Sequence, residues 1–143
     1  MATTTFLSNA TVNITQGATT YDVTDQVSSA VLTVGYDQLE STAFTSSGSP
    51  TGHTWVAGLQ TGELALSMYL SYGSSEVEDM IQACVGKTST IVISPSGTTE
   101  SATNPEYTLS AFLPEGPVIN SNMGELATAE ITFQISTWSR DNS

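Results

Sequence analysis

Residues 38–72 read QLESTAFTSSGSPTGHTWVAGLQTGELALSMYLSY, and this stretch decides the fold that the sequence predicts. Its last part, residues 63–72, alternates Leu64, Leu66, Met68 and Leu70 with smaller or polar side chains, a period typical of a strand with one buried face. Its first part is rich in Ser, Thr and Gly, and there we expect a long loop over residues 41–60. Compact domains rarely keep such a loop without a use for it.

The predicted loop carries side chains that a merely solvated linker does not need. They are four large apolar residues and the only histidine of the chain: Phe44, His53, Trp55, Val56 and Leu59. We interpret the loop as an arm that completes its burial against a neighbouring subunit. These five residues are therefore candidate subunit-interface residues.

Further strands are predicted on both sides of this stretch, from alternating or β-branched apolar residues bounded by turn residues. They cover residues 27–36, 88–94, 107–113 and 125–138. In the last one Trp138 breaks the alternation, which indicates a bulge or a strand end. A large amphipathic ring at such a place often meets a partner, so Trp138 is a further interface candidate.

One short amphipathic helix is predicted over residues 75–85, flanking the strands. Ser75 and Glu78 have the spacing of a capping box, and Val77, Met80, Ile81 and Cys84 follow at helical spacing. We expect a mainly β fold: an antiparallel β-sandwich or barrel-like subunit with this one helix. A length of 143 residues suits a single domain over residues 1–143. A Thr-rich N-terminal arm, residues 1–20, would dock as an edge strand or stay mobile.

The charge of the chain limits its partners. The chain has fourteen Asp and Glu residues and only two basic residues, Lys87 and Arg140, which gives a formal net charge of −12. Such a charge disfavours direct binding to nucleic acid or to an anionic membrane. At an assembly surface it makes association sensitive to salt. We also recognise no secretory signal at the start and no apolar run near the roughly 20 residues that a membrane span requires.

Residues able to carry catalysis or bind a metal are few. Cys84 is the only cysteine, which excludes an intramolecular disulfide, and we expect it buried and inert on the apolar helix face. A Ser-His-Asp site would have to use His53, and the chain has no nucleophile-elbow motif. Asp22 and Asp25 are better explained as turn caps. We therefore expect no enzyme activity, no metal and no cofactor.

The order of elements and several local stretches resemble the tail tube, or major tail, proteins of long-tailed bacteriophages. The stretches are residues 22–34, 53–59 leading into 64–72, and 103–107 through 124–133. The resemblance implies a β-sandwich flanked by a helix, whose strands join six-fold into a ring around a continuous inner β-barrel. Such rings stack into a hollow tube through which genomic DNA passes during ejection.

The resemblance also implies partners and a location. The protein would be part of the virion tail, assembled in the bacterial host cytoplasm, with itself, a tape measure, a terminator and a distal tail protein as partners. DNA would pass through without specific binding, because an acidic lumen repels phosphates. Glu130, on the polar face of the longest predicted strand, is the candidate lumen-facing acid, although an exterior solvated position suits it equally. Neighbours would close the open edges of strands such as residues 125–138.

Other functions stay open at this point. A capsid decoration protein would clamp a shell with the Thr-rich arm, and a tail terminator would form one ring and stop. A β-sandwich carbohydrate-binding or adhesin module is less favoured, because the aromatic residues are spread through strands and one loop. We expect residues 41–60 and the first ten residues to be mobile in a monomer and to fold on contact.

Overall fold

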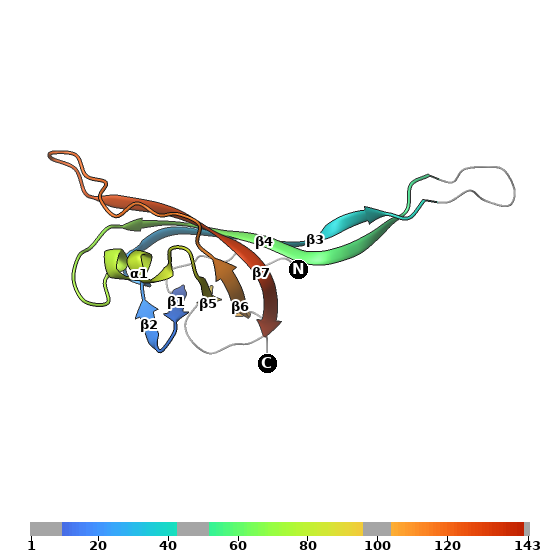
Figure 1. Ribbon diagram of the computed structural model, residues 1–143, viewed down its shortest axis with the longest axis horizontal. Helices are drawn as coiled ribbons and strands as arrows, with labels where there is room; N and C mark the ends of the chain where they lie inside the picture. Colours follow the sequence, from blue (N-terminus) through green and yellow to red (C-terminus); the bar gives the residue numbers. More distant parts are fainter. Residues whose placement is uncertain (1–9, 43–51, 96–103, 142–143) are drawn as a thin grey trace, which may run out of the picture.

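The structure is a computed structural model that describes residues 10–42, 52–95 and 104–141. Its elements are β1 Thr11–Gln16, β2 Thr19–Asp22, β3 Val27–Glu40, β4 Trp55–Tyr69, α1 Val77–Cys84, β5 Thr88–Ser94, β6 Glu106–Phe112 and β7 Thr128–Asp141. All neighbouring strands pair antiparallel in one sheet of order β2-β1-β5-β6-β7-β4-β3 (Figure 1). The predicted mainly β, antiparallel fold with one short helix is confirmed.

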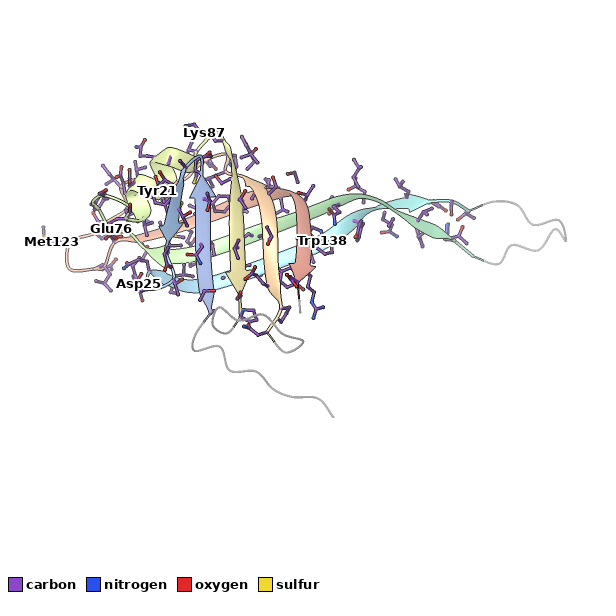
Figure 2. All side chains as sticks on the ribbon, turned by 90° about the horizontal axis from the view of Figure 1, so that it is seen from below. Tyr21, Asp25, Glu76, Lys87, Met123 and Trp138 are labelled. Carbon is purple, nitrogen blue, oxygen red and sulfur yellow. The ribbon has the colours of Figure 1, made fainter. Side chains whose placement is uncertain are left out.

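The strand β7 forms the corner of the sheet. Residues 128–135 pair with β4, whereas residues 134–141 pair with β6. The register shift between Ser110 and Ala111 leaves Ser136 as an extra residue of β7, and its hydroxyl donates to the Ser110 carbonyl at 3.0 Å. A bulge of this kind bends a strand and increases its twist. The sheet therefore folds over itself without closing into a barrel, and β1, β5 and β6 cross the long strands (Figure 2).

The hydrophobic core lies between the two halves of the folded sheet, with α1 at one end (Figure 1). The predicted inward faces of β4 and β7 are buried, as are the apolar positions of α1. The largest fully buried side chains include Ile14, Leu64, Leu66, Met68, Met80, Ile81, Ile91, Leu109 and Phe133. Strands from both ends of the chain thus contribute to a single core.

The helix begins differently from the prediction. Its N-cap is Glu76, without a side-chain cap, and Ser75 has a φ of 65°, far from the extended conformation of a capping serine. Ser71 takes the place of Ser75 as the capping residue. The Ser71 hydroxyl accepts from the Val77 N–H at 3.3 Å and donates to the Glu76 carboxylate at 2.8 Å. Asp79 accepts from the Ser75 N–H at 2.9 Å. The predicted capping box is wrong, because a serine outside the helix satisfies the orphan amide.

Residues 10–18 do not form the edge strand or mobile arm that was predicted for residues 1–20, so that prediction is wrong for most of the described part of this segment. β1 and β2 form a hairpin whose turn contains Gly17 with a φ of 63°. β1 lies inside the sheet, between β2 and β5, and its Val12 and Ile14 are buried. Because these side chains belong to the core, the hairpin is part of the domain. Residues 1–9 lie outside the described residues.

The outer strands of the sheet are not those that the sequence suggested. The predicted strand over residues 125–138 corresponds to β7, which has β6 on one side and β4 on the other. The two outer positions of the described sheet belong to β2 and β3. Only residues 134 and 135 pair with both neighbours, whereas residues 128–133 pair with β4 alone and residues 137–141 with β6 alone. The predicted strand is therefore not an outer strand of the sheet, but each half of it keeps one side without a strand partner in the described part of the chain.

Candidate assembly surfaces

The strands β3 and β4 continue beyond the rest of the sheet as a two-stranded arm (Figure 1). β7 pairs with β4 only as far as Gly62, whereas the pairing of β3 with β4 continues to Glu40 and Trp55. We define the arm as residues 36–40 and 55–61. The predicted loop over residues 41–60 is therefore wrong from residue 55 onward. Phe44 lies in residues 43–51, outside the described residues.

A bulge in β4 explains why this strand was hard to recognise. The register shift between Tyr36 and Gln38 sets two residues, Gly58 and Leu59, opposite Asp37. The extra residue interrupts the two-residue alternation that marks a strand. A Cβ atom on Gly58 would lie 3.0 Å from the Asp37 Cβ, so close packing favours glycine there.

Both faces of the arm expose apolar side chains. Directly opposed residues of antiparallel strands share a face, so Leu39 and Val56 lie on one face, and Tyr36 and Trp55 on the other. These four side chains are about half exposed. Leu59 precedes Gln60, which pairs with Tyr36, so Leu59 lies on the face of Leu39 and Val56, where it is 78% exposed. An isolated two-stranded ribbon is at best marginally stable in water. The arm is therefore suited to burial against another surface on both faces.

His53 holds the end of the arm together. Its Nδ1 contacts a carboxylate oxygen of Glu40, and its ring stacks on Trp55 with centroids 5.9 Å apart. The Thr42 hydroxyl donates to Glu40 at 2.9 Å and accepts from the Thr54 N–H at 2.9 Å. The hydrogen bonds from His53 and then Thr42 lower the pKa of the Glu40 carboxyl. Three of the predicted interface residues, His53, Trp55 and Val56, thus lie together at one end of the molecule.

Trp138 lies at the base of the arm (Figure 2). Its ring packs against Tyr36, and its Nε1–H donates to the Gly35 carbonyl at 3.5 Å. The Trp138 carbonyl accepts from the Gln60 side chain at 3.2 Å. The irregularity predicted at Trp138 lies two residues earlier, at Ser136. Trp138 therefore has partners within its own chain, and it remains half-buried.

The outer face of the long strands is polar, with acids as its only charges among the described positions. We define this outer face as the side of β3, β4 and β7 turned away from β1, β5 and β6 (Figure 1). On it, Glu130 lies opposite Ser67, and Glu63 opposite Gln134, and both acids are exposed. The remaining positions are Ser29, Val31, Thr33, Gly35, Thr61, Ala65, Tyr69, Thr128 and Thr132. Glu130 thus lies on a solvated strand face, as its position predicted.

The strand β3 occupies one end of the sheet along its whole length of 14 residues. Within the described residues no strand pairs with its second side. An unpaired edge of this length is a template for a strand of another chain. Together with the arm, it makes β3 the main candidate for contact between copies.

The connection between β6 and β7 carries an apolar patch that the sequence analysis missed. Ile119, Met123 and Leu126 are 79%, 103% and 75% exposed. They lie at the end of the molecule opposite the arm, as the labelled Met123 shows (Figure 2). The three residues follow neither a strand nor a helix period, so only their number in a turn-rich segment could have drawn attention to them.

The structure shows where the few residues considered for chemistry lie. In ranges 10–42, 52–95 and 104–141, no three or more His, Cys, Asp or Glu side chains gather to bind a metal ion. Cys84 is fully buried, and burial raises the pKa of its thiol. Asp22 caps a turn, accepting from the Thr24 N–H at 3.1 Å. None of the helices described is long and apolar enough to cross a membrane.

No protein family model and no curated protein matches the chain. Solved structures do match. A chain of the SPP1 tail tube is 11% identical, with a TM-score of 0.69 over 94% of this chain and 77% of that chain. A chain in the sheath/tube terminator of PVC, an extracellular contractile injection system, is 18% identical, with a TM-score of 0.63 over 98% of both chains.

A chain in the tube terminating cap of the anti-feeding prophage also matches. It is 18% identical, with a TM-score of 0.59 over 100% of this chain and 95% of that chain. At such identities these likenesses establish the fold. The chain therefore has the fold found in phage tail tubes and in the tubes and terminators of injection systems, as its resemblance to tail tube proteins implied.

Proposed function

We propose that this chain is a structural protein of a phage-type tail that assembles with copies of itself into stacked, six-fold rings forming a hollow tube. The observation that carries the proposal is the arm, which leaves the body with apolar side chains exposed on both faces. Its apolar surface favours association, because exposed apolar patches of this kind mark sites of contact between proteins. The fold shared with tail tube structures supports the same role.

The open edge of β3 supplies the contact within a ring. Backbone N–H and C=O groups along an unpaired strand favour pairing with a strand of the next copy. Contacts between unlike surfaces of identical chains generate rings when the rotation closes. In this proposal the sheet continues from copy to copy, and the number of six copies follows from the resemblance to tail tube proteins.

The outer face lines the bore in this proposal. Its charged side chains in the three-stranded region are Glu63 and Glu130, and most of the others are hydroxyl-bearing. Like charges keep a DNA duplex from adhering to the wall, because binding to phosphates requires cationic side chains. The tube thereby lets DNA pass without binding it at any particular base sequence.

The proposal extends to the setting of the protein. Residues 1–143 form a single domain, and the tube works in the virion tail after assembly in the cytoplasm of the bacterial host. Its other partners are a tape measure, a terminator and a distal tail protein. The role is structural, as in the tail assemblies that share the fold, and it involves no enzyme activity, cofactor or membrane.

A tail terminator is the second candidate, favoured by the matches to terminator and cap structures over 98% and 100% of this chain. A terminator would form one ring and stop. No described feature favours a capsid decoration protein or a carbohydrate-binding module.

Negative-stain electron microscopy over a concentration series, in low and moderate salt, tests the proposal. Long hollow rods are expected, and discrete rings would instead indicate the terminator. Dispersed monomers at every concentration would overturn both. Leu59→Ser should prevent rods, because Leu59 is exposed on the arm. Gln82→Ser is the matched control, since Gln82 is exposed on α1, away from the arm.

A further inference from the structure

The loop between β6 and β7 and the arm hold the most exposed apolar side chains of the described residues. Among the large apolar residues, the four highest exposures belong to Met123, Ile119, Leu59 and Leu126. Leu59 lies on the arm, and we call the other three the loop patch. The two apolar surfaces are unlike in structure, since one is a strand ribbon and the other is a loop.

The loop patch is held in place by the fold. The Tyr72 hydroxyl donates to the Val118 carbonyl at 2.7 Å, and the Asn120 side chain donates to the Thr128 carbonyl at 3.0 Å. A Cβ atom on Gly116 would lie 2.9 Å from the Ile81 side chain, which shows how closely the start of the loop packs on α1. The apolar residues are therefore presented by an ordered support.

The arm and the loop patch lie at opposite ends of the molecule (Figures 1 and 2). Each copy has one of each. A contact of the arm of one copy with the loop patch of another buries both surfaces in every interior copy of an assembly. An arm-to-arm contact would bury only the arm and leave the loop patch in water. Exposed patches of this kind are unfavourable, so the head-to-tail arrangement is preferred.

The charges near both surfaces are acidic. Glu115 and Glu125 belong to the loop, and Asp37 and Glu40 belong to the arm. Burial of apolar area must therefore provide the attraction, while the acids repel one another. The same acids disfavour an anionic membrane as the occupant of the loop patch.

We propose that the loop patch of one copy receives the arm of another copy through the arm face formed by Leu39, Val56 and Leu59. This inference rests on the proposed self-assembly and names the surface through which it occurs. It assigns a function to Ile119, Met123 and Leu126, whose side chains are largely outside the core.

Cross-linking of two single variants tests the contact. Leu59→Cys and Met123→Cys are purified separately, mixed, assembled and treated with a short bis-maleimide. Cys84 does not compete because it is fully buried. A cross-linked dimer is expected in the mixture and in neither variant alone. A mixture of Leu59→Cys with Thr90→Cys, whose cysteine is exposed on β5, is the control and should give none.

The other outcomes separate this inference from the proposed function. Particles visible by electron microscopy without the cross-link would overturn the inference and leave the tube proposal standing. A dimer formed by Leu59→Cys alone, and not increased by mixing, would show that arms pack together and would also overturn it. Absence of particles from the unmodified chain, together with absence of cross-links, would overturn self-assembly itself.

A side-chain variant gives an independent measurement. Met123→Gln should raise the critical concentration for assembly about tenfold or more, because burial of this side chain no longer stabilises the contact. Thr90→Ala is the matched control and should leave the critical concentration unchanged. An unchanged value for Met123→Gln would contradict the proposed contact.

Discussion

The indole ring of Trp138 packs edge-on against the phenol ring of Tyr36, with ring centroids 5.7 Å apart and planes at 63°. Tyr36 belongs to β3 and Trp138 to β7, two strands separated in the sheet by β4. The contact therefore crosses β4 on the core side, at the point where the arm leaves the body. It joins the base of the arm to β7.

Coupling between these two rings is the first prediction. In a double-mutant cycle of Tyr36→Ala and Trp138→Ala, urea unfolding should give an interaction free energy of about 0.5–1.5 kcal/mol, as for other edge-to-face aromatic pairs. Trp55→Ala is the control partner, because Trp55 lies on the same face of the arm and contacts His53 instead. Additive effects of Tyr36→Ala and Trp138→Ala would show that the arm is positioned without this contact.

At acidic pH the contacts of Glu40 with His53 and Thr42 at the end of the arm should weaken. The folded-state pKa of Glu40 is lowered from its ordinary value of 4.5, first by His53 and then by Thr42. A lowered pKa means that the stabilisation is present above about pH 4.5 and is lost as the pH falls through the folded-state value. Side-chain NMR titration should place the Glu40 midpoint below 4.5. His53→Ala should raise that midpoint more than Thr42→Val does, and equal midpoints in all three proteins would contradict the assignment.

Gly62 should tolerate no side chain. A Cβ atom there would lie 2.8 Å from the Thr33 carbonyl oxygen and 3.3 Å from the Ile135 Cβ. Gly62→Ala should therefore reduce the free energy of unfolding by about 1–3 kcal/mol, the usual cost of overpacking. Gly35→Ala is the matched control on the facing strand, since its nearest contact is 3.7 Å. A Gly62→Ala variant as stable as Gly35→Ala would show that the strands separate easily at this point.

Cys84 should react only when the protein opens. The thiol is fully buried, and burial raises its pKa, so the reactive thiolate is scarce in the folded state. Ellman's reagent should modify the folded chain far more slowly than a chain unfolded in urea. Gln82→Cys, exposed on the same helix, serves as the fast-reacting control. Equal rates at residues 82 and 84 would mean that α1 does not stay packed on the sheet.

Charge reversal on the outer face tests the proposed bore. Glu63→Lys with Glu130→Lys should change the free energy of unfolding by no more than about 0.5 kcal/mol, because both side chains are exposed. Assembled particles of this variant should retain linear DNA in low-salt sedimentation, whereas unmodified particles should not. Reversal of Asp25, which is exposed in the turn between β2 and β3, is the control. Identical DNA retention by both variants would place the outer face elsewhere than in the bore.

The sequence predicted the body of the sheet better than its extensions. The alternation of residues 63–69 and 128–135 is strong because one side of each strand faces the core and the other faces water. The arm has no such asymmetry, since Tyr36 and Trp55 are exposed on one face and Leu39 and Val56 on the other. The bulge at Gly58 and Leu59 also interrupts the two-residue alternation of side chains along β4. For this reason residues 55–60 resembled a loop.

The candidate assembly surfaces were predicted in part. Trp55, Val56 and Leu59 were selected because apolar residues in a polar segment stand out in the sequence. Ile119, Met123 and Leu126 were missed, because apolar residues in a turn-rich segment do not reveal whether they pack inward or remain exposed. Their exposure depends on how the loop packs on α1, which the local sequence does not contain.

By itself the sequence determined the β character of the chain, its short helix, its acidic charge and the burial of Cys84. These properties depend on composition and on which side of each element is apolar, and both are local. Only the tertiary structure decided that β1 lies inside the sheet, that β7 forms its corner and that β3 is an outer strand. Strand order depends on which strand edges meet, and contacts such as Ile14 with Ile91, or Leu64 with Phe133, join residues far apart in the chain.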